Sequence, residues 1–219
     1  MKIIDLSFEI ENNMPTCGTS WHQKVEIKQI GYVDKVGRNT HSIMLGSHTG
    51  THIDAPLHFI ENGQSIEKVD LSILCGKIKI VDFTNVQQGG FVSLSMLKNI
   101  EVEQRMLFRF DWHKKWKTPE YYNNFPYFEE DAIDYLINNG MQLIAIDTPS
   151  PDSGINISSF DDSPNHKKLL KNNVVIIEYL NNTDLLNPKF ENSIYALPLK
   201  IKGSDGSPSR AIVVEKKIS

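Results

Sequence analysis

Runs of apolar residues along the chain predict a fold built mainly from β-strands. The strongest patterns are short apolar runs between polar residues, as in strands that are buried on both faces. These runs cover residues 77–83, 105–110, 141–147, 173–180, 194–201 and 210–215. Residues 2–10 and 24–33 alternate in part, and in 24–33 the apolar positions change face near Gly31, which indicates a β-bulge.

Three segments have the end signals of helices. Residues 93–100 begin with the cap residue Ser93, and residues 129–140 have acidic residues in the first turn and Gly140 after the last. Residues 163–173 begin with Ser163 and Pro164, a good pair of cap and first helical residue. Because helices fall between strands in the second half, we expect a mixed α/β or α+β fold with a mixed sheet.

The remaining segments contain no boundary between domains. We expect residues 61–72 to form a turn and a short extended segment, and residues 111–127 to form a long aromatic loop. No linker or internal repeat interrupts the chain, so we predict one domain over residues 1–219.

Composition and charge narrow the classes of protein. The chain has 40% hydrophobic and 23% charged residues, which is typical of globular domains, and a net charge of −4. Its lysines are dispersed, so we expect no nucleic-acid partner and no anionic membrane partner. Asp5 and Glu9 interrupt the first apolar run, which does not resemble a signal peptide, and no apolar stretch is long enough to cross a bilayer.

The two cysteines, Cys17 and Cys75, bear on the compartment. They can form one disulfide or remain two thiols, and they lack the close spacing of a zinc knuckle. We expect a cytoplasmic protein, in which two thiols are the simpler interpretation.

The stretch "SHTGTHIDAPLHF", residues 47–59, contains His48, His52, Asp54 and His58. Two neutral imidazoles and a carboxylate are a normal ligand set for zinc or another first-row divalent metal. The alternative is a polar loop with surface histidines. Thr49 and Thr51 are weaker candidates for a side-chain nucleophile, because nothing in the sequence marks either of them.

Regular secondary structure does not bring His48, His52 and Asp54 together. A helix puts the two histidines on one face but turns Asp54 away, and a strand separates the histidines by about 13 Å, at ~3.3 Å per residue. Gly50 and Pro56 predict an irregular backbone that lets the three side chains converge.

A second half of the site is found far along the chain. Glu178 interrupts an apolar run, where a buried carboxylate is costly unless it is paired or bound to a cation. Alternatively, Glu178 ends the strand at the surface or pairs with a lysine. His166 begins the preceding helix, whose first turn can lie beside the far end of that strand, so His166 and Glu178 could meet.

The run His48-x-Gly50-Thr51-His52-x-Asp54-x-Pro56-x-His58 resembles the signature of the cyclase family of metal-dependent hydrolases, which includes bacterial kynurenine formamidases and isatin hydrolases. The later segments "AIDTPSPD" (145–152) and "ALPLKIKGSDGSPSRAIV" (196–213), with His166 and Glu178, resemble that family too, in the same order. The resemblance implies a swivelling β/β/α fold with a barrel-like core, in homodimers or homotetramers.

The resemblance also implies roles for individual residues. His48, His52 and Asp54 match ligands of one metal, while Asp54, His166 and Glu178 match ligands of a second, so Asp54 would bridge the two. His58 matches a catalytic histidine. Family members use zinc, and some use manganese. The implied reaction is hydrolysis of a small carbonyl compound by metal-activated water, with His58 moving the proton to the leaving group.

The substrate is less well defined. We expect cleavage of a C–N bond in a small amide or formamide, such as N-formylkynurenine, with a cyclic amide or lactone as the alternative. A metal-binding protein without catalysis is a third hypothesis. Ser150 and Asp147 could lie near the site or only shape a turn. Aromatic residues could line the pocket or belong to the core, and the candidates are Trp21, Trp112, Trp116, Tyr121 and Tyr122.

Overall fold

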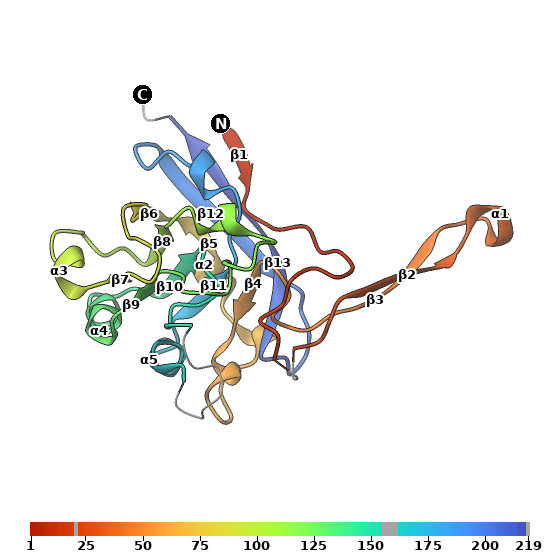
Figure 1. Cartoon of the computed structure of the whole chain (residues 1–219), viewed down its shortest axis with the longest axis horizontal. Helices are drawn as coiled ribbons and strands as arrows, with labels where there is room; N and C mark the ends of the chain where they lie inside the picture. Colours follow the sequence, from red (N-terminus) through yellow and green to blue (C-terminus); the bar gives the residue numbers. More distant parts are fainter. Residues whose placement is uncertain (20–21, 155–161, 218–219) are drawn as a thin grey trace.

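One curved mixed sheet dominates the computed structural model, which describes residues 1–19, 22–154 and 162–217 (Figure 1). Its strands follow the order β5-β12-β13-β4-β11-β10-β8-β6, and β1 also pairs with β13. The strands are β1 (Lys2–Asp5), β4 (His52–Asp54), β5 (Cys75–Lys77), β6 (Lys79–Asp82), β8 (Arg105–Arg109), β10 (Leu143–Ile146), β11 (Val175–Glu178), β12 (Glu191–Pro198) and β13 (Gly206–Lys216).

The sheet closes on itself almost completely. Strands β5 and β6 lie at opposite ends of the strand order, yet only Ile78 separates them in the sequence. The sheet must therefore curl until its two ends meet, which gives a barrel-like core. Strands β6, β8, β10 and β11 pair in parallel, whereas β4 pairs antiparallel with β11 and with β13. The mixed α/β fold with a barrel-like core is confirmed.

Alternate residues of the parallel strands face two separate apolar cores. In β10, Leu143 and Ala145 pack inside the barrel, whereas Ile144 and Ile146 pack on the outer face. Continuous apolar runs are expected for such strands, because both of their faces are buried. The outer core also takes up residues of the helices α3 (Leu94–Leu97), α4 (Glu130–Asn138) and α5 (Pro164–Lys171).

The three predicted helices are present, but their lengths differ from the predicted ones. All three begin within one residue of the predicted start, but α3 spans only Leu94–Leu97. For residues 61–72, the expected turn is present at residues 61–62, but the expected extended segment was wrong, since a 3-10 helix, Ile66–Lys68, and the start of α2 (Leu71–Leu74) follow. The Asp70 carboxylate accepts a hydrogen bond from the amide of Ser72, which caps α2.

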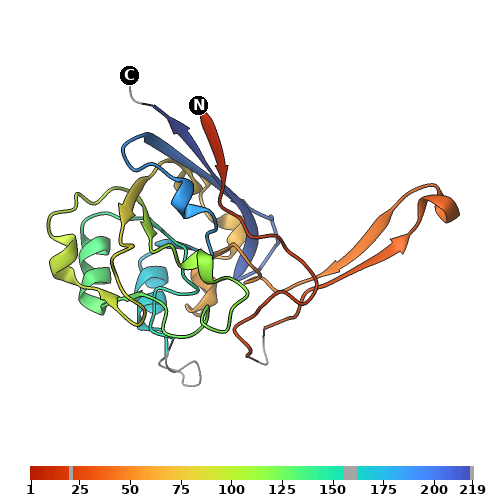
Figure 2. The same ribbon diagram turned by 45° about the horizontal axis from the view of Figure 1, so that its top comes forward.

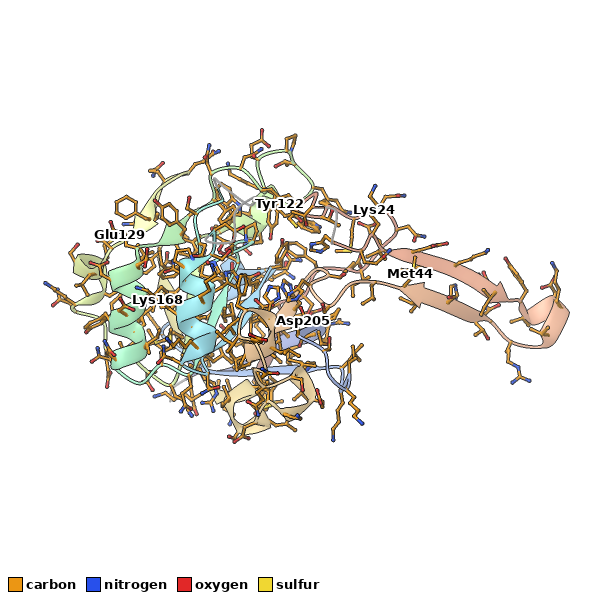
Figure 3. The ribbon with its side chains drawn as sticks, turned by 90° about the horizontal axis from the view of Figure 1, so that it is seen from below. Lys24, Met44, Tyr122, Glu129, Lys168 and Asp205 are labelled. Carbon is orange, nitrogen blue, oxygen red and sulfur yellow. The ribbon has the colours of Figure 1, made fainter. Side chains whose placement is uncertain are left out.

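A hairpin arm projects from the body (Figures 1 and 2). It consists of β2 (Glu26–Gly31), α1 (Val33–Val36) at the tip and β3 (Thr40–Met44). The register of its two strands shifts between Gln29 and Gly31, which confirms the predicted bulge. In Figure 3, Lys24 and Met44 mark the base of the arm, and the arm's side chains extend away from the rest of the molecule.

Loops and short elements complete the described structure. Strands β7 (Phe91–Val92) and β9 (Tyr127–Phe128) form a small parallel pair. Short 3-10 helices lie at Pro56–His58, Trp112–Lys115 and Thr183–Leu185. Within the described residues, no helix is both long and apolar enough to span a bilayer.

Candidate metal centre

The register between β4 and β11 creates the floor of the candidate site. Glu178 lies opposite His52, and Ile176 lies opposite Asp54. Because side chains alternate along a strand, His52, Asp54 and Glu178 project from the same face of the sheet, on the side of α5. All three are buried, so the alternative in which Glu178 ends at the surface is wrong.

A bend at Gly50 brings His48 back over this floor. Gly50 has a φ of +59°, in the left-handed region that favours glycine, as the sequence predicted. His48 Nδ1 then lies 2.7 Å from Asp54 Oδ1, and the rings of His48 and His52 are 5.0 Å apart. The expectation of an irregular backbone was right for His48 but wrong for His52 and Asp54, which lie on a regular strand.

Gly206, the first residue of β13, makes room for His48. A Cβ atom there would lie 2.9 Å from His48 Cε1 and 2.8 Å from the carbonyl oxygen of Ile53. Both distances are too short for a side chain, so only glycine lets β13 approach β4 while His48 keeps its place.

His166 enters from the first turn of α5, where the sequence placed it. Its Nε2 lies 3.1 Å from Glu178 Oε1 and 3.5 Å from Asp54 Oδ2. Its Nδ1 lies 2.6 Å from Asp152 Oδ2, and the Asp152 carboxylate also accepts hydrogen bonds from the backbone amides of Asn165 and His166. Asp152 therefore caps the helix and orients the ring, whereas Ser163 makes no capping hydrogen bond.

The imidazoles are held so that one nitrogen of each faces the carboxylates. His52 Nδ1 lies 2.8 Å from the carbonyl oxygen of Gly50, which can only accept, so Nδ1 donates and Nε2 is left to face the carboxylates. His52 Nε2 lies 3.3 Å from Asp54 Oδ1 and 3.5 Å from Glu178 Oε2. An outer acceptor that fixes the tautomer is the usual surrounding of a metal-ligating histidine.

His58 and His48 share a further carboxylate, Asp205, which sequence reasoning did not single out. Asp205 Oδ2 lies 2.8 Å from His48 Nε2 and 3.1 Å from His58 Nδ1. The turn-like residues "GSDG" around Asp205 hid this role, because such a pattern usually signals only a loop. Figure 3 shows Asp205 near the centre of the molecule.

The electrostatics of the cluster fit a divalent cation. Among the described residues, Asp54 Oδ1, Asp54 Oδ2 and Glu178 Oε1 are buried and make no well-aligned hydrogen bond, although imidazole nitrogens lie nearby. Burial raises the pKa of Glu178. Burial lowers the pKa of His48, but the charges of Asp54 and Asp205 outweigh this effect and raise it to about 10. Buried carboxylates of this kind are normally compensated by a cation.

Two groups of ligand atoms converge and have Asp54 in common. His52, Asp54 and Glu178 offer ligand atoms that lie within 4.8 Å of one another, and so do His48, Asp54 and His58. Because Asp54 belongs to both groups, the geometry is compatible with two cations. The roles assigned from the sequence resemblance, including a catalytic His58, remain predictions.

A cavity of about 320 Å³ opens over the cluster. Its lining includes four aromatic side chains, Phe59, Tyr122, Phe125 and Tyr179. Of the aromatic residues proposed from the sequence, Tyr122 lines this cavity, Trp112 and Tyr121 belong to the apolar core, and Trp116 stacks on Phe8. Trp21 lies outside the described residues.

Ser150 and Asp147 have different positions. Ser150 lines the cavity, whereas Asp147 accepts hydrogen bonds from the backbone amides of Phe110 and Asp111 and from the hydroxyl of Thr183. Asp147 therefore fixes the start of the aromatic loop. Asp147 also lies beside Asp111 and His113, and these three residues form a further group that could hold a metal ion. In this group, however, the Asp111 carboxylate already accepts a hydrogen bond from Arg109.

Known proteins resemble this chain over most of its length. The family model named Cyclase matches residues 4–153. The chain belongs to the cyclase family. The kynurenine formamidase of Bacillus cereus is 32% identical over 216 residues, covering 96% of each chain. Cyclase-like protein 3 of Oryza sativa subsp. japonica is 28% identical and matches 98% of this chain and 80% of its own length.

Solved structures show the same fold. Isatin hydrolase A from Labrenzia aggregata superposes with a TM-score of 0.86 at 24% identity, covering 97% of this chain and 93% of its own. A protein described as a predicted metal-dependent hydrolase, from Bacillus stearothermophilus, gives a TM-score of 0.78 at 26% identity, and the match covers 97% of both chains. The sequence resemblance is thus confirmed, and with it the function class, a metal-dependent amide hydrolase.

Proposed function

We propose that this cyclase-family hydrolase cleaves the C–N bond of a small aryl amide or formamide, such as N-formylkynurenine. The observation that carries the proposal is the position of the His52–Asp54–Glu178 cluster at the floor of an aromatic-walled cavity. A buried ligand cluster supplies the chemistry, and an aromatic wall suits a planar ring. The similarity to a kynurenine formamidase of Bacillus cereus supports the choice of substrate.

The proposed cofactor is a pair of divalent metal ions, with zinc expected and manganese as the alternative. His48, His52 and Asp54 would hold one ion, and Asp54, His166 and Glu178 the other. When bound, such ions lower the pKa of water and polarise a carbonyl oxygen. Neutral imidazole and carboxylate ligands suit either of these metals.

The chain's own residues would position the substrate and move the proton. His58 Nδ1 is oriented by Asp205 Oδ2, so its Nε2 is left to accept a proton and pass it to the leaving nitrogen. Phe59, Tyr122 and Phe125 would enclose the aromatic ring and exclude water from it.

Substrate hydrolysis by the purified protein tests this function. N-formylkynurenine, an isatin-like cyclic amide and an aryl lactone should be assayed at equal concentrations, with metal content measured in the same preparation. We expect the formamide to give the highest kcat/KM. Turnover of only the cyclic compounds would favour the alternative substrate class, and a metal-loaded protein without any turnover would favour a non-catalytic metal-binding role.

We further propose that residues 1–219 act as one domain in a cytoplasmic homo-oligomer, a dimer or a tetramer. The arm supports the oligomer, because an isolated two-stranded hairpin is only marginally stable in water and apolar patches mark interfaces. Its exposed apolar residues are Ile30, Tyr32, Val33, Val36, Ile43 and Met44. The free thiols of Cys17 and Cys75 support the cytoplasmic location.

A further inference from the structure

The wall of the catalytic cavity contains a thiol that the proposed hydrolysis does not use. Cys17 lies in the segment between β1 and β2 and lines the cavity together with His22. Its Sγ lies 3.1 Å from His22 Nδ1 and 3.3 Å from Thr19 Oγ1. Cys75 lies on β5 and is not among the residues that line this cavity.

The surroundings of Cys17 favour its thiolate. Burial raises the pKa of the thiol, but hydrogen bonds with His22 and Thr19 outweigh this effect and lower it to about 7. The phenols of Tyr122 and Tyr179 also face this region, and burial raises the pKa of each, so both are neutral near pH 7. The cavity's remaining titratable side chains are His48, His52, His58, Asp152, Asp162, His166 and Glu178.

We propose that Cys17, with His22 as its proton partner, is a covalent modification site in the cavity wall that reacts with small organic disulfides. The Cys17 thiolate attacks one sulfur of the disulfide, a new S–S bond forms, and the original S–S bond breaks. The departing thiolate takes up the proton that the Cys17 thiol has passed to His22. The disulfide is the only oxidant in the step, and a free thiol reverses it.

The adduct would obstruct the proposed catalytic reaction. Cys17 lines the same cavity of about 320 Å³ as His58, His166 and Tyr122, so a group attached to its sulfur occupies space that a substrate needs. This consequence rests on the proposed hydrolase function, whereas formation of the adduct does not.

Reaction with 5,5′-dithiobis(2-nitrobenzoic acid), followed on the metal-loaded protein between pH 5.5 and 9.5, tests the site. The chain has two cysteines, so Cys75→Ser isolates Cys17 and Cys17→Ser is the matched control. A thiol of lower pKa has a larger thiolate fraction at pH 7, but its thiolate is a weaker nucleophile. Compared with an ordinary thiol of pKa about 8.5, we therefore expect Cys17 to react only roughly threefold faster at pH 7. The midpoint of the pH profile is therefore the more decisive readout.

In Cys75→Ser we expect a rate that is half-maximal near pH 7, and in His22→Gln/Cys75→Ser a midpoint at least one pH unit higher. A midpoint at pH 8 or above in Cys75→Ser, or an unchanged pH 7 phase in Cys17→Ser, would overturn the proposal. An unshifted midpoint in the His22 variant would overturn the role of His22.

Hydrolysis of the best substrate before and after modification tests the obstruction. Modified Cys75→Ser should lose at least tenfold in activity and regain it with dithiothreitol, whereas Cys17→Ser should keep its own untreated activity. Full activity despite an adduct seen by intact mass would overturn the obstruction. If the unmodified protein hydrolyses none of the substrates, the hydrolase function fails, and the pH profile still decides whether Cys17 is reactive.

Discussion

At the scale of residues, four imidazoles and two buried carboxylates converge because each imidazole has one nitrogen held from outside. Gly50 holds His52 through its carbonyl oxygen, Asp152 holds His166, and Asp205 holds both His48 and His58. The opposite nitrogens of His48, His52 and His166 approach Asp54. In this arrangement the candidate ligands are distinct from the groups that orient them.

Replacing His58 tests whether it carries a proton or binds metal. We expect His58→Gln to lower kcat by about 10²- to 10⁴-fold, the usual contribution of general acid–base catalysis, while the metal content stays at the wild-type value. Steady-state kinetics and elemental analysis of the same preparation measure both. Because His58 Nδ1 or Nε2 can also converge with His48 and Asp54, loss of metal in this variant would make His58 a ligand instead.

The raised pKa values of two histidines predict a steep pH dependence of metal affinity. In the metal-free protein, Asp54 and Asp205 raise the pKa of His48 to about 10, and Glu178, with Asp152, raises that of His166 well above its usual value despite burial. A metal must displace these protons, so its affinity increases with pH until the protons are gone. Between pH 6.5 and 8 we expect at least a tenfold gain per pH unit, measured by competition with a zinc chelator. Affinity that is constant above pH 7 would contradict this coupling.

The sequence pointed to the candidate ligands better than to the residues that orient them. His48, His52, Asp54 and His58 stand out because they crowd into eleven positions, and Glu178 because it interrupts an apolar run. Asp152 and Asp205 lie in segments that look like ordinary turns, "PSPD" and "GSDG". Their partners come from distant parts of the chain, and no local pattern encodes that contact.

At the scale of elements, the site depends on how closely β13 approaches β4. Gly206 pairs with Asp54, and its position leaves no room for a methyl group between Ile53 and His48. The shape of the candidate site therefore depends on the backbone contact between β13 and β4 as much as on the candidate ligands.

Gly206→Ala tests this packing. We expect it to destabilise the protein by roughly 1–3 kcal/mol, the usual cost of overpacking, and to weaken metal binding because His48 must move. Gly46→Ala is the matched control, since its added methyl would meet its nearest neighbour at an ordinary 3.5 Å. Urea unfolding and metal titration of both variants give the comparison, and equal behaviour of the two variants would refute the close-approach argument.

Strands with long apolar runs were predictable from the sequence, and several short or exposed elements were not. The runs that became β8, β10 and β11 are buried on both faces, so their apolar composition identified them. Strand β3 escaped detection because every one of its residues is exposed, and β4 because it is only three residues long and carries two polar ligand candidates, His52 and Asp54. Sequence patterns report runs of buried apolar residues, and neither strand contains one.

At the scale of the whole molecule, the arm projects from the body and is tied to it near its base, where the Asn12 side chain exchanges two hydrogen bonds with the backbone of Ile27. Strands β2 and β3 pair with each other and, among the described residues, with no other strand. A second copy of the chain is the partner that we propose for its apolar residues.

Ile43→Glu tests this assembly. We expect it to convert the oligomer to a monomer in light scattering coupled to gel filtration, because a charge would be buried at the interface. Leu71→Glu, at an equally exposed position on the body, should keep the wild-type mass. If the wild-type chain is itself monomeric, or if both variants keep the oligomer, the arm has another role.

The central claim is that Asp54 is shared by two metal ions held by His48, His52, His166 and Glu178. The most direct measurement is the metal content per chain of protein purified without chelator, by elemental analysis. We expect two first-row divalent ions per chain in the wild type. One ion per chain would contradict the shared role of Asp54, and none would contradict the metal centre as a whole.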